Sequence, residues 1–194
     1  MAEVYRPAED SWLLEQCIVK ESLKGKKCLD IGCGCGIQSV AMLKSGAKEV
    51  VSVDVNETAL TVTKVAVESY IKGLEENMTQ IVGHSLFYSI IESNLFSNIE
   101  GKFDFIAFNP PYVPSDEIKW SDLDGGENGR EVIDAFVETV DSHLTENGVI
   151  MLLLSSLNNI DDVSKTLSKK GYDVKNRGNK KLFFEELVVL RAEK

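Results

Sequence analysis

The sequence has no apolar run long enough to cross a lipid bilayer. Its longest uninterrupted apolar stretch covers residues 149–154, whereas a membrane-spanning helix needs about 20 apolar residues. The first ten residues also lack the apolar segment of a signal peptide. We therefore expect a cytoplasmic or nuclear protein that makes no contact with a membrane.

Cysteine and histidine are scarce, with four and two residues respectively. Cysteines of a cytoplasmic or nuclear protein are normally reduced thiols, so no disulfide framework is expected. Cys33 and Cys35 do not have the spacing of a zinc knuckle, and no second pair of ligands lies near them in the sequence. We therefore expect no intrinsic metal site.

Basic residues are also few, with 21 lysines and arginines against 31 acidic residues and a net charge of −10. Broad binding to a nucleic-acid backbone requires a basic surface. The sequence offers only short lysine pairs, such as residues 26–27 and 180–181. Direct nucleic-acid binding is therefore not expected, although the fold or a partner could assemble a small basic patch.

Expected strands and helices alternate along the chain without an internal repeat, which predicts one domain over residues 1–194. Helical patterns cover residues 8–22, 37–45, 56–72, 130–143 and 159–169. Strand patterns cover residues 27–31, 49–54, 79–83, 103–108, 148–154, 172–177 and 183–190. Residues 84–99 show no clear pattern, and residues 109–128 have the composition of a loop.

This alternation predicts an α/β fold, with a mostly parallel sheet and helices on both of its faces. The last two strands have no helix between them and should form an antiparallel hairpin at the end of the sheet. Ligands of such sheets bind at the carboxyl ends of the central strands. Polar residues at those strand ends are therefore the candidates for a functional site.

The first candidate is the sequence Asp-Ile-Gly-Cys-Gly-Cys-Gly of residues 30–36, at the end of strand 27–31. Glycines allow the backbone to turn sharply and to approach a ligand closely. Asp30 would offset the ammonium or sulfonium charge of S-adenosylmethionine, whereas it would repel the pyrophosphate of NAD. Asp54, at the end of strand 49–54, can accept both ribose hydroxyls of an adenosine. We therefore predict an S-adenosylmethionine site that includes Asp30, Gly32, Gly34, Gly36 and Asp54, with NAD as the weaker alternative.

The second candidate follows strand 103–108 and reads Asn109-Pro110-Pro111-Tyr112. The nitrogen of an amide or aromatic amine is a poor nucleophile because its lone pair is delocalised. The side-chain oxygen of Asn109 can accept one N–H of such a group, and the carbonyl of Pro110 can accept the other. Proline restricts the loop, and Tyr112 offers an aromatic wall. We predict catalytic roles for Asn109, Pro110 and Tyr112, a substrate site over residues 109–112, and contact of Asn109 with the cofactor.

These motifs together resemble those of the HemK-like methyltransferases, in the branch found in eukaryotes and archaea. The resemblance rests on residues 5–14, 30–36, 54, 109–112 and 125–132, which occur in the family's order. It implies the class I methyltransferase (Rossmann-like) fold with a seven-stranded sheet. It also implies methylation of the glutamine in the Gly-Gly-Gln motif of the class 1 translation termination (release) factor. The cofactor would be S-adenosyl-L-methionine, with S-adenosyl-L-homocysteine as product.

The resemblance also assigns roles to single residues. Ser11, in the N-terminal helical segment 1–22, would lie over the cofactor. Family members usually carry an acidic residue near the adenine, in the loop after the third strand. This chain departs from the family there: after the strand expected at residues 79–83 it has Gly-His-Ser-Leu at 83–86, without an acidic residue. Ser85 would instead hydrogen-bond the adenine amine, with Leu86 beside it.

A partner is the last implication of the resemblance, because the eukaryotic members pair with a small zinc-binding activator subunit. The sequence is compatible with such a heterodimer. Strand 79–83 is expected at the edge of the sheet, where another chain can add a strand.

Three alternatives remain open at this point. A nucleic-acid N-methyltransferase acting on adenine or cytosine would use the same Asn-Pro-Pro-Tyr chemistry, but the net charge and the lack of a target-recognition domain argue against it. A protein lysine methyltransferase is possible, although paired acceptors suit a planar NH₂ group better. A catalytically silent scaffold would not need Asp30, Asp54 and Asn109.

Overall fold

The computed structural model describes residues 4–77, 86–114, 125–126 and 128–194. Within them, a seven-stranded sheet has the order β3-β2-β1-β4-β5-β7-β6. The strands are β1 (Lys27–Ile31), β2 (Glu49–Asp54), β3 (Phe87–Glu92), β4 (Phe103–Phe108), β5 (Leu144–Ser155), β6 (Asp173–Lys181) and β7 (Glu186–Glu193). Neighbours among β1 to β5 are parallel, and β7 is antiparallel to both β5 and β6. The expected mostly parallel sheet with a C-terminal antiparallel hairpin is confirmed.

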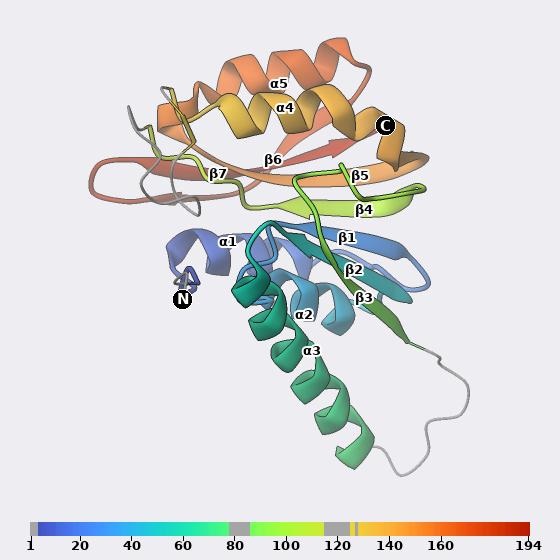
Figure 1. Cartoon of the computed structure of the whole chain (residues 1–194). Helices are drawn as coiled ribbons and strands as arrows, with labels where there is room; N and C mark the ends of the chain where they lie inside the picture. Colours follow the sequence, from blue (N-terminus) through green and yellow to red (C-terminus); the bar gives the residue numbers. More distant parts are fainter. Residues whose placement is uncertain (1–3, 78–85, 115–124, 127) are drawn as a thin grey trace.

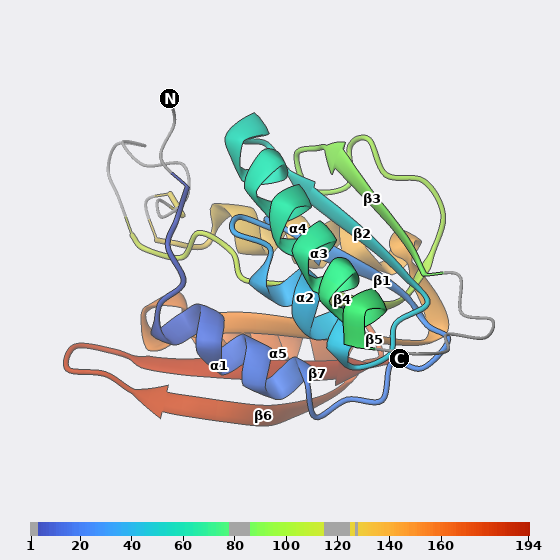
Figure 2. The same ribbon diagram turned by 90° about the horizontal axis from the view of Figure 1, so that it is seen from below.

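Helices cover both faces of this sheet (Figures 1 and 2). They are α1 (Glu9–Ile18), α2 (Ile37–Lys44), α3 (Glu57–Asn77), α4 (Glu131–Thr139) and α5 (Ile160–Lys169), with short 3₁₀ helices η1 (Val140–His143) and η2 (Ser156–Asn158). Helices α4 and α5 cover one face, and α1, α2 and α3 cover the other. None of the described helices is both long and apolar enough to cross a membrane.

Two apolar cores result, one on each side of the sheet. In β4, Ile106 and Phe108 belong to the core under α4 and α5, whereas Phe105 and Ala107 belong to the core under α1 to α3. All four side chains are buried. A strand buried on both faces is apolar at successive positions, which is why residues 105–108 form a continuous apolar run rather than an alternation. The chain leaves this buried strand at Asn109.

Three helix predictions differ from the structure at their ends. Helix α3 continues through Gly73 to Asn77, whereas residue 72 was its expected end. Helix α1 ends at Ile18 instead of residue 22, because the chain turns more tightly there: the N–H of Glu21 donates to the carbonyl of Ile18 at 2.9 Å. The helix expected at 130–143 changes from α4 to the 3₁₀ helix η1 at Val140. Apolar periodicity alone does not distinguish these hydrogen-bonding patterns.

The prediction for the third strand was wrong. The structure places β3 at Phe87–Glu92, within the segment that showed no clear pattern, and pairs it in parallel with β2. Residues 79–83 and Ser85 lie outside the described residues. Strand β3 is the edge of the sheet and is only partly buried. Four of its six residues are aromatic or β-branched, as is typical of a strand, but they do not alternate with polar residues and are followed by a segment rich in Ser and Asn, so the pattern was not clear. Leu86 precedes β3 and packs against the core under α1 to α3. It therefore lies before the amino end of β3, whereas the cavity lies at the carboxyl ends of the strands. The assignment of Leu86 to the adenine site was wrong.

Candidate active site

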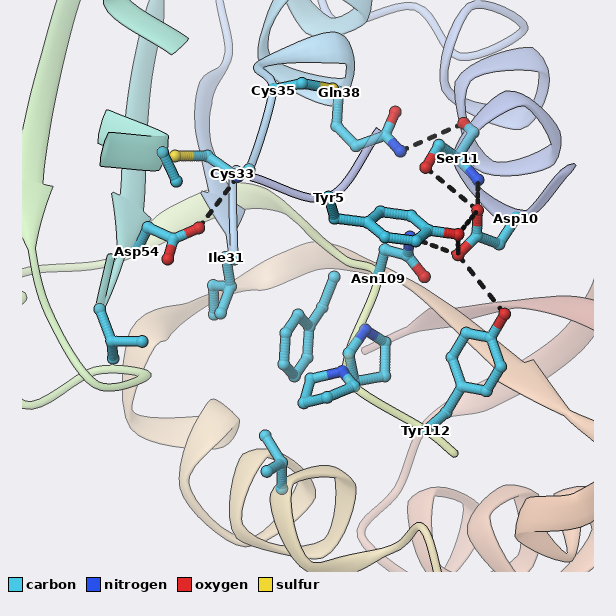
Figure 3. A pocket seen from close by; sticks show the side chains of 18 of the residues that line it. Tyr5, Asp10, Ser11, Ile31, Cys33, Cys35, Gln38, Asp54, Asn109 and Tyr112 are labelled. Carbon is cyan, nitrogen blue, oxygen red and sulfur yellow. Dashed lines mark hydrogen bonds between the residues drawn. The ribbon is translucent and has the colours of Figure 1, made fainter. Parts of the chain in front are cut away.

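A cavity lies at the carboxyl ends of the parallel strands (Figure 3). Its walls come from the ends of β1, β2 and β4, from the loop after β3, and from the segment that leads into α1. Most of the predicted site residues line it, namely Ser11, Gly32, Gly34, Asp54, Asn109, Pro110, Pro111 and Tyr112. The structure therefore brings together motifs that are up to about a hundred positions apart in the chain.

The glycine turn forms one wall of the cavity. Gly32 and Gly34 have φ angles of 64° and 50°, which side chains rarely adopt, so glycine is required for this turn. The N–H of Gly34 donates to Oδ2 of Asp54 at 2.9 Å, and the N–H of Asn56 donates to Oδ1 at 2.9 Å. These bonds fix the Asp54 carboxylate beside the turn, at the end of β2.

Asp30 and Gly36 do not line the cavity. Asp30 is 1% exposed and lies beneath the turn, where Ser39 Oγ donates to its Oδ2 at 2.5 Å. Burial raises the pKa of Asp30 to about 7, and the hydrogen bond from Ser39 only partly opposes this effect. Gly36 faces helix α3, where an added Cβ would lie 3.0 Å from the Cα of Thr63. Direct contact with the cofactor was expected for Asp30 and Gly36. In the structure these two residues support the glycine turn instead.

Asn109 has a defined orientation in the site. Its Nδ2 donates to Oδ2 of Asp10 at 3.2 Å. Its Oδ1 is buried and has no hydrogen-bond partner among the described residues. Because the Asp10 carboxylate can only accept hydrogen bonds, the Asn109 amide turns its nitrogen toward Asp10 and its oxygen away from it. An unpaired buried acceptor is costly unless a ligand provides a donor.

Asp10 joins the N-terminal segment to the catalytic loop (Figure 3). Its carboxylate is 3% exposed and accepts from Tyr5 Oη at 3.1 Å, from Ser11 N at 2.5 Å and from Tyr112 Oη at 3.4 Å. Burial first, and then the charge of Asp10, raise the pKa of Tyr5 and of Tyr112 far above the usual value. Both phenols therefore stay protonated and act as donors.

Sequence reasoning missed Asp10 as a site residue. The simplest reading of an acidic residue in the first turn of a helix is that it complements the helix dipole. That reading is compatible with its position in α1, but the tertiary contacts of Asp10 are with residues about a hundred positions away. Its presence in the motif of residues 5–14 was the available signal.

Gln38, at the start of α2, is a second residue that sequence reasoning missed. Its Nε2 donates to the carbonyl of Ser11 at 3.2 Å, which ties α1 to the glycine turn. The side chain is 4% exposed and lines the cavity, and its Oε1 has no partner among the described residues. It lies in a helix that the sequence indicated, but only the packing of α1 on α2 gives it a polar partner.

The loop after β3 provides a third group of missed residues, Ser93, Asn94 and Leu95, all on the cavity wall. The N–H of Ser93 donates to the carbonyl of Asp54 at 3.0 Å, and its Oγ donates to the carbonyl of Leu95 at 2.9 Å. This loop occupies the place that the sequence analysis gave to Ser85 and Leu86. Correct placement of β3 would have identified it.

The segment around Gly129 encloses the catalytic loop from outside. An added Cβ at Gly129 would collide with the carbonyl oxygen of Tyr112. The buried Nδ2 of Asn158 donates to the carbonyls of Tyr112 at 2.8 Å and of Gly129 at 3.0 Å. Arg130 forms ion pairs with Asp134 and Asp162. In the described residues, this segment therefore has a supporting role.

Comparisons with known proteins agree with this geometry. Residues 8–181 match the family model of the methyltransferase small domain. The chain is 39% identical, over 98% of its length and 91% of the other, to a Methanocaldococcus jannaschii protein named as a candidate protein N5-glutamine methyltransferase. It is 29% identical to mouse methyltransferase HEMK2, over 99% of this chain and 90% of that one. A solved structure of the E. cuniculi Mtq2-Trm112 complex, described as methylating the eRF1 termination factor, matches with a TM-score of 0.74 and 28% identity over 98% of both chains.

Proposed function

The chain belongs to the methyltransferase small domain family, and from this premise we propose that it methylates a glutamine side chain. The acceptor is the amide nitrogen of the Gly-Gly-Gln glutamine in a class 1 translation termination factor. The observation that carries this proposal is the orientation of Asn109, whose oxygen is left without a partner at the cavity wall. The similarity to the Mtq2-Trm112 structure supports the identity of the substrate.

The cavity suits a cationic cofactor such as S-adenosylmethionine. Among the described residues that line it, Asp10 and Asp54 are acidic and none is basic. Gln38 adds an acceptor oxygen without a partner in the described structure. A pyrophosphate-containing dinucleotide would meet repulsion here. We propose that Gly32, Gly34 and Asp54 hold the adenosine end, that Ser11 and Gln38 lie near the amino-acid end, and that Ser93 to Leu95 border the adenine. When bound, the cofactor supplies an electrophilic methyl group.

The residues of the loop after β4 then orient the acceptor nitrogen. Asn109 Oδ1 accepts one N–H of the glutamine amide, and the carbonyl of Pro110 accepts the other, which aligns the nitrogen with the methyl group. The nitrogen–carbon bond would form as the sulfur–methyl bond breaks, so that positive charge moves from the sulfonium to the nitrogen and S-adenosylhomocysteine is the leaving group. The two acceptors favour that charge, and Asp10 strengthens the effect by polarising the Asn109 amide. The nitrogen finally loses one proton, so that the product amide is neutral.

We also propose that the chain is the catalytic subunit of a heterodimer with a small zinc-binding activator. Among the described strands, β3 pairs only with β2, so its other edge can receive a strand from a partner. Phe87, at the start of β3, is 54% exposed and would be covered. Because translation termination takes place in the cytoplasm, we propose that location for the complex.

A transfer assay with labelled S-adenosylmethionine tests the proposal. The chain and its activator would be offered the intact termination factor, the same factor with its Gly-Gly-Gln glutamine changed, and duplex DNA. We expect label on the intact factor alone. Label on DNA alone, or on the factor lacking the glutamine, would contradict the proposed substrate while leaving the methyltransferase family unaffected.

A further inference from the structure

The tip of the β6–β7 hairpin carries an exposed aromatic pair. Phe183 and Phe184 are 91% and 88% exposed, and their rings contact each other edge to face with centroids 4.6 Å apart. The hairpin extends beyond the helices that cover the sheet (Figures 1 and 2). Adjacent aromatic side chains with nearly all of their surface in water are characteristic of a contact site for another molecule.

The tip is held in a defined conformation. The N–H of Leu182 donates to the carbonyl of Glu185 at 2.8 Å, which closes the turn. The N–H of Glu186 donates to Ser156 Oγ at 3.0 Å, which joins the hairpin to η2. Leu182 packs against the same apolar core as Tyr112. The aromatic pair is therefore presented by an ordered turn, and little conformational entropy is lost on binding.

The tip is joined to the active site by packing, because Leu182 at the tip and Tyr112 of the cavity wall pack against the same apolar core. The charge of Glu185 contributes to the raised pKa of both Tyr5 and Tyr112, two residues of the cavity wall. One oxygen of Glu185, Oε2, is inaccessible to water and has no hydrogen-bond partner among the described residues. The hairpin thus combines an apolar contact surface with an unpaired acceptor near the cavity.

We propose that residues 182–185 form the docking surface for the polypeptide that carries the acceptor glutamine. This inference rests on the proposed function. Only the glutamine side chain has to enter the cavity, so the main chain of the substrate must lie outside it. Phe183 and Phe184 contact apolar groups of that segment. The proposed activator would bind at a different surface, because β3 and β6 are at opposite edges of the sheet.

Steady-state kinetics of the double variant Phe183→Ala/Phe184→Ala test this surface. The assay uses the complex with its activator and the full-length termination factor. We expect KM for the factor to rise tenfold or more, with kcat changed less than twofold, and cofactor affinity by calorimetry unchanged. Val65→Ala is the matched control, because Val65 is 59% exposed on α3 and should not affect KM.

The outcomes separate the two proposals. If the wild-type complex methylates the factor and the double variant has the same KM, the docking surface is wrong and the proposed function stands. If the wild-type complex does not label the factor, the proposed function is wrong, and the docking inference fails with it.

Photo-crosslinking provides a measurement that does not depend on turnover. Benzoylphenylalanine at position 183 should capture the termination factor, whereas the same probe at position 65 should not. Capture of the activator instead of the factor at position 183 would overturn the inference.

Discussion

Asp10 has the most consequential contacts of any single residue in the site. It joins Tyr5, Ser11, Asn109 and Tyr112 through one buried carboxylate. An asparagine amide can turn over and present either its oxygen or its nitrogen, and an acceptor on one side decides which. The chemistry proposed for Asn109 therefore depends on a residue that itself need not touch the substrate.

Asp10→Asn tests this dependence, because the variant has nearly the same shape but removes the charge and adds a donor. We expect kcat to fall by about a hundredfold, comparable with the loss of an oriented donor or acceptor in other active sites. Cofactor affinity by calorimetry should change only a few-fold. Asn109→Ala should likewise retain cofactor binding and lose most of the transfer activity.

The double variant Asp10→Asn/Asn109→Ala is the control. It should be no slower than Asn109→Ala alone, because the two residues act as a unit. Independent losses that multiply would show that Asp10 does not act through Asn109.

Asp30 predicts a pH dependence of stability. Its pKa in the folded protein is raised to about 7, whereas an unfolded aspartate titrates near 3.9. Between these values the folded state binds more protons, so the free energy of unfolding decreases as the pH rises. Asp30→Asn should remove this loss, which amounts to about 2–3 kcal/mol between pH 5 and pH 8. Urea unfolding at both pH values measures it, and an equal pH dependence of the two proteins would contradict the assignment.

At the scale of elements, the site depends on segments that fold over the catalytic loop. The loop after β4 is partly buried at residues 109–112, and Nδ2 of Asn158 in η2 donates to the carbonyl of Tyr112. Such a carbonyl would otherwise be costly. The hydrogen bond from Asn158 therefore helps to fix the loop that carries the two proposed substrate acceptors, Asn109 Oδ1 and the carbonyl of Pro110.

Asn158→Ala should therefore affect both stability and turnover. It leaves the carbonyls of Tyr112 and Gly129 without their donor, which should cost about 2–4 kcal/mol of unfolding free energy. Thermal unfolding measures this loss. Asn179→Ala, at an exposed position of β6, is the control and should leave the melting temperature nearly unchanged.

The edge of β3 that pairs with none of the described strands allows a prediction about the partner. Phe87→Glu places a charge on the surface that we assign to the activator. We expect its affinity for the activator to fall tenfold or more in calorimetric titration. Val19→Glu, on the exposed end of α1, should not weaken association. Unchanged binding by the Phe87 variant would place the partner on another surface.

At the scale of the whole molecule, ligand binding should stabilise the fold by mass action. S-adenosylmethionine at a hundred times its Kd should add about 2.7 kcal/mol to the free energy of unfolding. For a chain of this size that corresponds to a rise in melting temperature of about 5–10 °C. NAD at the same concentration should give no shift. A shift with NAD alone would contradict the cofactor assignment.

Much of the fold could be predicted from the sequence, and most of the predicted site residues line the cavity. Strands β1, β2 and β4 are buried on both faces, so their apolar composition identifies them. Gly32 follows β1, Asp54 ends β2 and Asn109 follows β4, so the position of these residues at strand ends marks them as site candidates. Strand β3 was missed because its aromatic and β-branched residues do not alternate with polar ones and lie next to a segment rich in Ser and Asn. The error in β3 then assigned the adenine wall to Ser85 and Leu86 instead of Ser93 to Leu95.

The sequence by itself determined the α/β class, the order of the elements, and which strand ends carry chemistry, because these follow from apolar periodicity and from residue types at successive positions. The tertiary structure alone decided which of those residues reach the cavity. Asp30 lies beneath the turn because β1 buries it, and Asp10 reaches Asn109 because α1 packs beside the carboxyl end of β4. Contacts between distant segments depend on how the layers pack, and no local pattern in the chain records that packing.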